Sequence, residues 1–437
     1  MAIKKISDAL LVPLEAKRLL REIALLRRLR HRNVIALLDI LPPSNAAAFR
    51  DLYLVYELMD TDLYAVIRSA QPLSEAHTAY FTWQMFCGLR YLHEAGVIHR
   101  DVNPANLLVN ASCRLKIADF GLARPAPRDE EREGGAKLSA YVVTRWYRAP
   151  ELLLCCPSYG AAVDLWAAGC VLAELLGRRA LLPGRDAAHQ LSLVLGVVGT
   201  PPPEALRAAA SPAAAAYAAK LPAAERVSFR HLYPGASEDA AALLDALLVF
   251  EPARRLSAQD ALRHPFFAVY AAGEEAAEAA AAAAAAPPAS DFDFAFEKET
   301  LSQDAARTLL LAEVQALRAA APRGSDAGGG AAEDQAAAGS DTDALASAMA
   351  RLSADMARSA AAAATASLAA ASQAAAGEAR LSRSPEPPMP RPPKSARGGG
   401  GNGSGIEGAS SGVVLQPRSR SVTPPQPRPQ HAASPAA

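Results

Sequence analysis

Three short clusters of polar residues give this sequence its potential for chemistry. They occupy residues 99–106 (HRDVNPAN), residues 119–121 (DFG) and residues 149–151 (APE). Each cluster alone is a weak signal, but their order and spacing make chance very unlikely. Several of their side chains could accept a proton or bind a metal ion, among them Asp101, Asn106 and Asp119. Because carboxylate and amide oxygens are hard ligands that suit Mg²⁺, the sequence predicts that these side chains converge on one metal-bound site.

Over roughly residues 1–270, this pattern resembles the eukaryotic protein kinases. The resemblance implies that Asp101 accepts the proton of a substrate hydroxyl, while Asn106 and Asp119 hold Mg²⁺ on the phosphates of ATP. It also implies that Lys4 contacts the α- and β-phosphates and that Glu22 pairs with Lys4. Taken alone, Lys4 and Glu22 would be read as an ordinary exposed strand lysine and a helix glutamate.

Finer matches resemble the mitogen-activated protein kinases. Residues 57–63 (ELMDTDL) are similar to the hinge of that family, which implies that Met59 lies on the adenine edge and Asp62 faces the ribose. By the same resemblance, Tyr56 is the gatekeeper and Leu108 floors the adenine pocket. The nucleotide-contacting residues that follow from the resemblance are Lys4, Tyr56, Glu57, Met59, Asp62 and Leu108.

Residues 142–148 (VVTRWYR) resemble the substrate-docking segment of that family, which implies a preference for Ser or Thr followed by Pro. The residues concerned are Thr144, Arg145 and Arg148. Three features favour this family over the cyclin-dependent kinases. They are Arg145, an insert that includes residues 217–234, and the Phe-rich segment at residues 292–296. The Phe-rich segment resembles a C-terminal wrap onto the small lobe, although an isolated aromatic cluster is the alternative. Arg255 is expected to anchor Glu151.

The segment between these motifs resembles an activation loop. Ser139 and Tyr141 are the predicted phosphorylation sites, which implies an upstream activating kinase; the alternative is an unmodified surface loop. A phosphate on Ser139 would order the loop by adding strong acceptors for guanidinium groups. The residues expected to receive that phosphate are Arg18, Arg21, Arg100 and Arg124.

The sequence departs from the family at four places. One is the activation segment, where residues 139–141 read SAY and relatives have Thr, an acidic residue or another spacer, then Tyr. No glycine-rich loop precedes Lys4, so we expect either a gene model truncated inside a strand, which we favour, or altered ATP binding. Asn103 replaces a lysine that would place a positive charge at the γ-phosphate. The acidic docking groove expected after Tyr270 is reduced to Glu274, Glu275 and Glu278, for which a solvated run of charges is the expected reading.

The elements that must position these residues follow from hydrophobic periodicity. The predicted helices are residues 13–30, 74–96 and 162–176, and the predicted strands are residues 34–40 and 52–56. Pro13 suits a first helical turn, Ser74 is a predicted N-cap, and Gly96 is a predicted helix stop.

Composition excludes several classes of protein. The 437 residues carry 45 Lys plus Arg and 45 Asp plus Glu, so the basic excess of a nucleic-acid binder is missing. Five cysteines are too few and too irregularly spaced for a disulfide framework or a zinc site. Neither a signal peptide nor a membrane span is recognisable. We therefore expect neither nucleic-acid nor membrane partners, and we expect a location in the cytoplasm, the nucleus or both.

These observations predict an α+β, two-lobed protein kinase fold. The expected parts are a small lobe with an incomplete sheet (1–60), a mainly helical large lobe (61–270), an extension that wraps onto the small lobe (271–320) and a mostly disordered, low-complexity tail (321–437). The tail has too little apolar surface to offset its chain entropy; a lone amphipathic helix is predicted at 341–358. The expected function is a Pro-directed serine/threonine kinase in a signalling cascade, and the alternative is a catalytically impaired kinase-like docking module.

Overall fold

The computed structural model describes residues 1–41, 43, 45–126, 145–156, 159–271, 273–288, 290, 292, 294–297 and 299–320. Three of the residues predicted to regulate or dock lie outside these ranges, namely Ser139, Tyr141 and Thr144. The predicted disordered tail and the helix predicted at residues 341–358 also lie outside them.

An antiparallel three-stranded sheet carries the N-terminal part of the site. Its order is β1 (Ala2–Ile6), β3 (Leu52–Tyr56), β2 (Leu37–Leu41), so that β3 lies in the middle. Lys4 is paired with Leu54 across β1 and β3. The strand predicted at residues 34–40 begins only at Leu37, because the residues before it pair elsewhere: Ile35 N donates to Ile117 O at 2.9 Å.

Helix α1 (Pro13–Leu26) packs beside this sheet with Pro13 in its first turn, as predicted. Its apolar residues form a buried stripe that includes Ile23 and Leu26. The helix ends four residues earlier than predicted. There the guanidinium of Arg30 donates to the carbonyls of Leu26 at 2.6 Å and Leu29 at 2.9 Å, which satisfies acceptors at the helix C-terminus.

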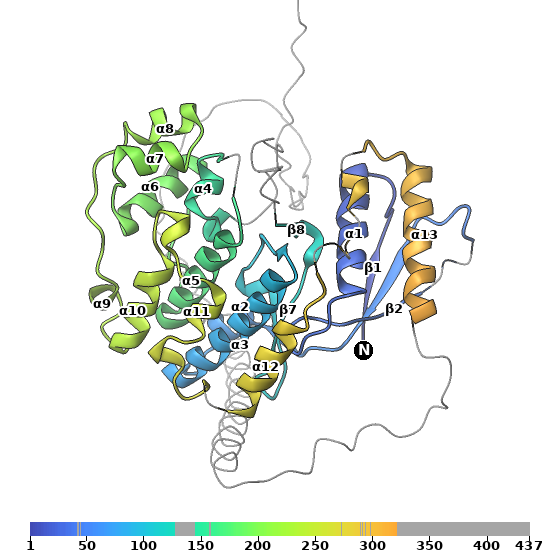
Figure 1. Ribbon diagram of the computed structural model, residues 1–437, viewed down its shortest axis with the longest axis horizontal. Helices are drawn as coiled ribbons and strands as arrows, with labels where there is room; N and C mark the ends of the chain where they lie inside the picture. The colour runs from blue at the N-terminus through green and yellow to red at the C-terminus, as the bar shows by residue number, and fades with distance from the viewer. Residues whose placement is uncertain are drawn as a thin grey trace, which may run out of the picture. The chain divides into compact units, whose positions relative to one another are not determined.

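Two long buried helices, α3 (Glu75–Glu94) and α5 (Ala162–Gly177), pack against each other at the centre of the helical part (Figure 1). Ser74 caps α3 by accepting a hydrogen bond from His77 N, and Gly96 follows the helix with φ +69°, so both predicted end signals are confirmed. The shorter helices are α2 (Leu63–Arg68), α4 (Pro150–Leu153), α6 (Ala187–Val198), α7 (Pro203–Ala208), α8 (Pro212–Ala218), α9 (Phe229–Leu232), α10 (Glu238–Leu247) and α11 (Ala258–Ala261).

Two small sheets and several 3₁₀ turns position the polar motifs. The sheets are β4 (Thr61–Asp62) with β6 (Leu107–Val109) and β7 (Leu115–Ile117), and β5 (Val97–Ile98) with β8 (Arg124–Pro125). The 3₁₀ turns are η1 (Pro104–Asn106), η2 (Phe120–Leu122), η4 (Arg145–Tyr147), η5 (Pro252–Arg254), η6 (Pro265–Phe267) and η8 (Ala295–Glu297).

Two helices of the C-terminal extension pack on different parts of the protein. Helix α12 (Glu274–Ala284) contacts α3, whereas α13 (Gln303–Ala320) contacts α1 and β2 (Figure 1). Glu278 is exposed, as expected of a solvated run of charges, whereas Glu275 is partly buried, and both are ion-paired. Because the buried face of α12 holds it on the helical part, Glu275 and Glu278 reach Arg32 and form ion pairs of 2.6 Å and 2.7 Å.

Candidate active site

Lys4 and Glu22 meet as the sequence predicts. Lys4 Nζ on β1 donates to both carboxylate oxygens of Glu22 on α1, at 3.1 Å each. Tyr56 on β3 donates its hydroxyl hydrogen to Glu22 Oε1 at 2.6 Å, a contact that sequence reasoning missed. Burial, together with the negative charge of Glu22, holds the pKa of Tyr56 far above its usual value, so the phenol remains a donor. The carboxylate of Glu22 is therefore held from two strands at once.

Asp101 lies in the loop between β5 and η1, where two amides hold its carboxylate. Asn103 Nδ2 donates to Asp101 Oδ1 at 3.1 Å, and Asn106 Nδ2 donates to Asp101 Oδ2 at 2.9 Å. Burial raises the pKa of Asp101 to about 6, and the neighbouring charge of Asp119 adds to this effect against the opposing charge of His99. A carboxylate with a pKa near the working pH is suited to accept a proton.

The hairpin of β6 and β7 brings Asn106 and Asp119 together. Leu107 pairs with Ile117 in this hairpin, and Ala118 N donates to Asn106 O at 2.9 Å. Asp119 has φ +64°, a left-handed conformation that is uncommon outside glycine and concentrated at functional sites. Its Oδ1 accepts a hydrogen bond from Gly121 N at 3.3 Å.

Asn106 and Asp119 could hold Mg²⁺ only together with ligands that do not come from the protein. In the part of the chain that the structure describes, no group of three or more His, Cys, Asp or Glu could hold a metal ion. Asn106 uses its Nδ2 on Asp101, so its amide oxygen and the Asp119 carboxylate are the hard ligands that these two residues could offer. Mg²⁺ is commonly held in this way, by one or two protein oxygens together with water and phosphate oxygens.

The predicted adenosine-binding residues come from β3, from the segment that joins β3 to β4, and from β4 and β6. Met59 and Leu108 are partly buried against the core, and Asp62 lies opposite Leu108 in the β4–β6 pair. Asp62 Oδ1 also caps α2 by accepting from Ala65 N at 2.8 Å. The carboxylate of Glu57 is engaged by Ala36 N at 2.8 Å and by Lys116 at 2.9 Å, so a contact with adenine would have to use its backbone.

Asp164 on α5 supports the catalytic loop from below and was missed by sequence reasoning. Its carboxylate accepts hydrogen bonds from His99 N at 2.9 Å and Arg100 N at 2.7 Å, and His93 Nε2 lies 2.9 Å away. Although burial opposes its ionisation, the hydrogen bond and charge of His93 outweigh that effect and lower the pKa of Asp164. An aspartate in the first turn of an almost wholly apolar helix is the signal that could have identified it.

Of the four arginines predicted to receive a phosphate, two meet at a carboxylate of the C-terminal extension. Arg21 Nε donates to Glu297 Oε1 at 2.7 Å, and Arg124 Nη1 lies 3.6 Å from the same oxygen. Arg100 donates to Leu122 O at 3.4 Å, and Arg18 pairs instead with Glu15 at 2.8 Å. Glu297 was not singled out from the sequence, because nothing local marks it as a partner of α1.

Of the predicted docking arginines, Arg145 begins η4 and Arg148 directly follows it. Arg145 Nη1 donates to Arg185 O at 3.0 Å. Burial lowers the pKa of Arg148, which also interacts electrostatically with Asp101. The predicted anchor is confirmed: Arg255 forms a bidentate pair with Glu151, with both bonds at 2.7 Å and both side chains almost fully buried.

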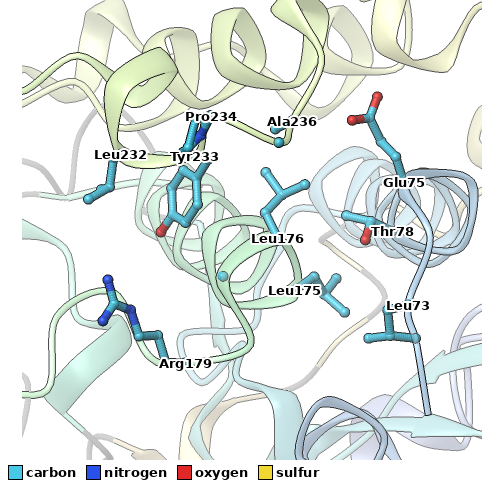
Figure 2. Close-up of a pocket in the computed structure, with 12 residues that line it drawn as sticks. Leu73, Glu75, Thr78, Leu175, Leu176, Arg179, Leu232, Tyr233, Pro234 and Ala236 are labelled. Atoms are coloured by element: carbon cyan, nitrogen blue, oxygen red, sulfur yellow. The ribbon is translucent and has the colours of Figure 1, made fainter.

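A pocket of about 470 Å³ lies away from this site, in the helical part (Figure 2). It is lined by residues of the α3 N-terminus, by the end of α5 and by residues 232–236. None of the predicted site residues lines it. In the part of the chain described here, no helix combines the length and apolar character needed to cross a membrane.

Comparison with known proteins gives a consistent result. Residues 1–267 match the family described as the protein kinase domain. The chain is 49% identical to mitogen-activated protein kinase 7 of Arabidopsis thaliana over 268 residues, which cover 61% of this chain and 72% of the relative. It is 45% identical to mitogen-activated protein kinase 4a of Physcomitrium patens over 314 residues, which cover 72% of this chain and 80% of the relative.

Proposed function

The chain belongs to the mitogen-activated protein kinases and is an ATP-dependent serine/threonine protein kinase, and from this premise we propose which of its residues perform the reaction. Members of this family use ATP and Mg²⁺, act on proteins and are activated by upstream kinases. We further propose that this chain acts in the cytoplasm, the nucleus or both, and that its substrates carry Ser or Thr followed by Pro.

Asp101 is the proposed general base. The supporting observation is its environment: a buried carboxylate with a pKa of about 6, held in one orientation by Asn103 and Asn106. In this role Asp101 would take the proton of the substrate hydroxyl as that oxygen forms its bond to the γ-phosphorus, while the bond from the γ-phosphorus to the β-phosphate oxygen breaks and ADP leaves. The orientation of Asp101 matters as much as its pKa, because phosphoryl transfer depends chiefly on positioning.

Asn106 and Asp119 are the proposed Mg²⁺ ligands. When bound, the ion neutralises charge on the phosphates of ATP. Lys4 is proposed to add a positive charge at the α- and β-phosphates, and its two bonds to Glu22 hold the ammonium group in place. Tyr56, Glu57, Met59, Asp62 and Leu108 are proposed to bind the adenosine.

We propose that residues 139–148 determine which substrates are accepted and carry the sites of activation. Thr144, Arg145 and Arg148 would form the surface that accepts the residue after the phosphorylated Ser or Thr. The electrostatic coupling of Arg148 to Asp101 supports a place near the reacting hydroxyl. Ser139 and Tyr141 would be phosphorylated by the upstream kinase. No contact among the described residues favours the alternative of a docking module without catalysis.

The role of Asp101 is tested by Asp101→Asn in the full chain. We expect phosphoryl transfer to a Ser-Pro peptide to fall at least about 10²-fold. The matched control is Asp245→Asn, which removes an exposed carboxylate paired with Arg226 at 3.0 Å and should leave the rate unchanged. Retention of most of the activity by Asp101→Asn would exclude Asp101 as the base.

The proposed Pro preference is tested on the same protein with two peptides. They differ only in carrying Pro or Ala after the acceptor Ser. We expect kcat/KM to be higher for the Pro peptide. Arg148→Ala should reduce the ratio of kcat/KM for the Pro peptide to kcat/KM for the Ala peptide, because Arg148 lies on the proposed docking surface. Equal kcat/KM for the two peptides would contradict the proposal.

A further inference from the structure

A cluster of arginines lies where α1, the Asp119 motif and the C-terminal extension meet. Arg21 on α1 is almost fully buried, and Arg124 on β8 is partly buried beside it. Both approach Glu297 Oε1, Arg21 through Nε at 2.7 Å and Arg124 through Nη1 at 3.6 Å. Among the described residues, Glu297 is the only carboxylate that is ion-paired to either of them.

The cluster carries more positive charge than this one carboxylate neutralises. Arg100 interacts electrostatically with Arg21 and Arg124, and its guanidinium lies over the Tyr159 ring at 5.4 Å. Burial, together with the positive charge of Arg21, lowers the pKa of Arg124 to about 10. Within the described residues, Arg100 Nε and the Tyr159 hydroxyl are buried without a hydrogen-bond partner. Such a cluster requires an anion, and Glu297 is the anion that it contains.

Arg21 transmits this contact to the catalytic residues. Its Nη1 donates to the carbonyl oxygen of Gly121, two residues after Asp119. Arg21 also precedes Glu22, the partner of Lys4, on α1. The position of Arg21 therefore links the placement of Glu22 to that of the Asp119 motif, and Glu297 is the group that orients the Arg21 guanidinium.

The backbone around Glu297 is fixed independently of its carboxylate. Lys17 Nζ donates to Glu297 O at 3.0 Å and to Glu299 O at 2.5 Å. Phe292 and Phe296 are buried in the core on the same segment. Removal of the carboxylate should therefore leave the segment docked, with the arginines facing a vacated anion position.

We propose that Glu297 is a positioning residue for phosphoryl transfer, the built-in anion of the Arg21–Arg124 cluster that holds α1 and Glu22 in the catalytic arrangement without a phosphate. This proposal rests on the proposed roles of Lys4, Glu22 and Asp119. It gives the C-terminal extension a part in catalysis through one carboxylate, and it makes that carboxylate a competitor of any phosphate that reaches the same guanidinium groups.

A binding experiment tests the anion position independently of catalysis. The melting temperatures of the full chain, Glu297→Ala and Glu313→Ala are measured with inorganic phosphate and with chloride at equal ionic strength. Glu313→Ala is the matched control, because it breaks another carboxylate pair of the extension, that of Glu313 with Arg27 at the end of α1, at 2.7 Å. Phosphate should raise the melting temperature of Glu297→Ala by about 2 °C or more and leave the other two unchanged.

An activity experiment tests the positioning role. With phosphatase-treated protein and a Ser-Pro peptide, kcat of Glu297→Ala should fall about tenfold, as expected when a charge-assisted hydrogen bond that orients a helix is lost. Inorganic phosphate, acting in place of the carboxylate, should restore most of that loss without stimulating the parent protein. Glu297→Gln, which keeps the size of the side chain, should lose activity similarly.

The two experiments separate the possible failures. Equal phosphate shifts in the parent and Glu297→Ala, or no shift in Glu297→Ala, would overturn the occupied anion position. Unchanged kcat in both Glu297 variants, or a loss that phosphate does not restore, would overturn the positioning role. A parent protein without phosphoryl transfer would count against the proposed function, and in that case the melting experiment alone decides whether Glu297 fills the cluster.

Discussion

At the scale of single residues, the environment of Asp101 leads to a pH prediction. Its pKa is raised to about 6 by burial and by Asp119, and the base must be unprotonated to act. We therefore expect kcat for a Ser-Pro peptide to be constant above this value. Below the pKa of Asp101 the rate should fall about tenfold per pH unit. Single-turnover rates measured from pH 5 to 8 test this. A profile that stays flat to pH 5 would contradict this assignment.

Asn103 leads to a second prediction at this scale. It stands where the family's lysine would place a positive charge at the γ-phosphate, and here it donates to Asp101 Oδ1 at 3.1 Å. Asn103→Lys should raise single-turnover phosphoryl transfer at least about tenfold, because one such preorganised charge is worth roughly 2–4 kcal/mol of barrier. Asn103→Lys both adds a positive charge and removes the hydrogen bond to Asp101. Asn103→Ala removes only the hydrogen bond, so the two variants together separate these effects. An unchanged rate for Asn103→Lys would refute the hypothesis.

The hydroxyl of Tyr56 provides a third prediction. It donates to the buried Glu22 at 2.6 Å, so Tyr56→Phe leaves Lys4 as the remaining side-chain partner of Glu22 in the described residues. We expect the free energy of unfolding to fall by about 1 kcal/mol and kcat to decrease. Tyr53→Phe on the same strand is the matched control for chemical denaturation, with an expected change within about 0.5 kcal/mol. Equal effects of the two variants would contradict the role of the Glu22 contact.

At the scale of elements, the pair of Arg255 and Glu151 joins α4 to the turn after η5. Both side chains are almost fully buried, so Arg255→Ala leaves an uncompensated carboxylate inside the protein. The expected loss is about 3–5 kcal/mol of unfolding free energy, measured by denaturant titration. Arg254→Ala is the matched control, because Arg254 is 73% exposed and pairs only locally with Glu251. A loss below about 1 kcal/mol for Arg255→Ala would show that the pair contributes little.

The types of helices and strands could be predicted from the sequence, but some of their ends could not. Ser74 and Gly96 mark the ends of α3 through local backbone needs, which a sequence displays directly. Residues before Leu37 were assigned to β2 but pair with β7 instead, since Ile35 bonds to Ile117. An extended apolar segment indicates a strand but not the strand with which it pairs, because tertiary contacts determine that pairing.

At the scale of the whole molecule, residues far apart in the chain complete the site. Glu297 reaches Arg21 across 276 positions, and Asp164 reaches Arg100 across 64. These contacts connect the C-terminal extension to α1, and the long apolar helix α5 to the catalytic loop. If the proposed role of Glu297 holds, a substitution in the extension should change catalysis although Glu297 contacts neither nucleotide nor peptide.

The sequence by itself determined the chemistry of the site. The order and spacing of the motifs that contain Asp101, Asn106 and Asp119 resemble the protein kinases, and the match of residues 1–267 to the protein kinase domain confirms that family. The tertiary structure alone decided which buried partners hold them: Tyr56 for Glu22, Asp164 for the catalytic loop and Glu297 for Arg21. The physical reason is that a motif records what a side chain can do, whereas its partner is chosen by packing, which brings together residues with no local signal of each other.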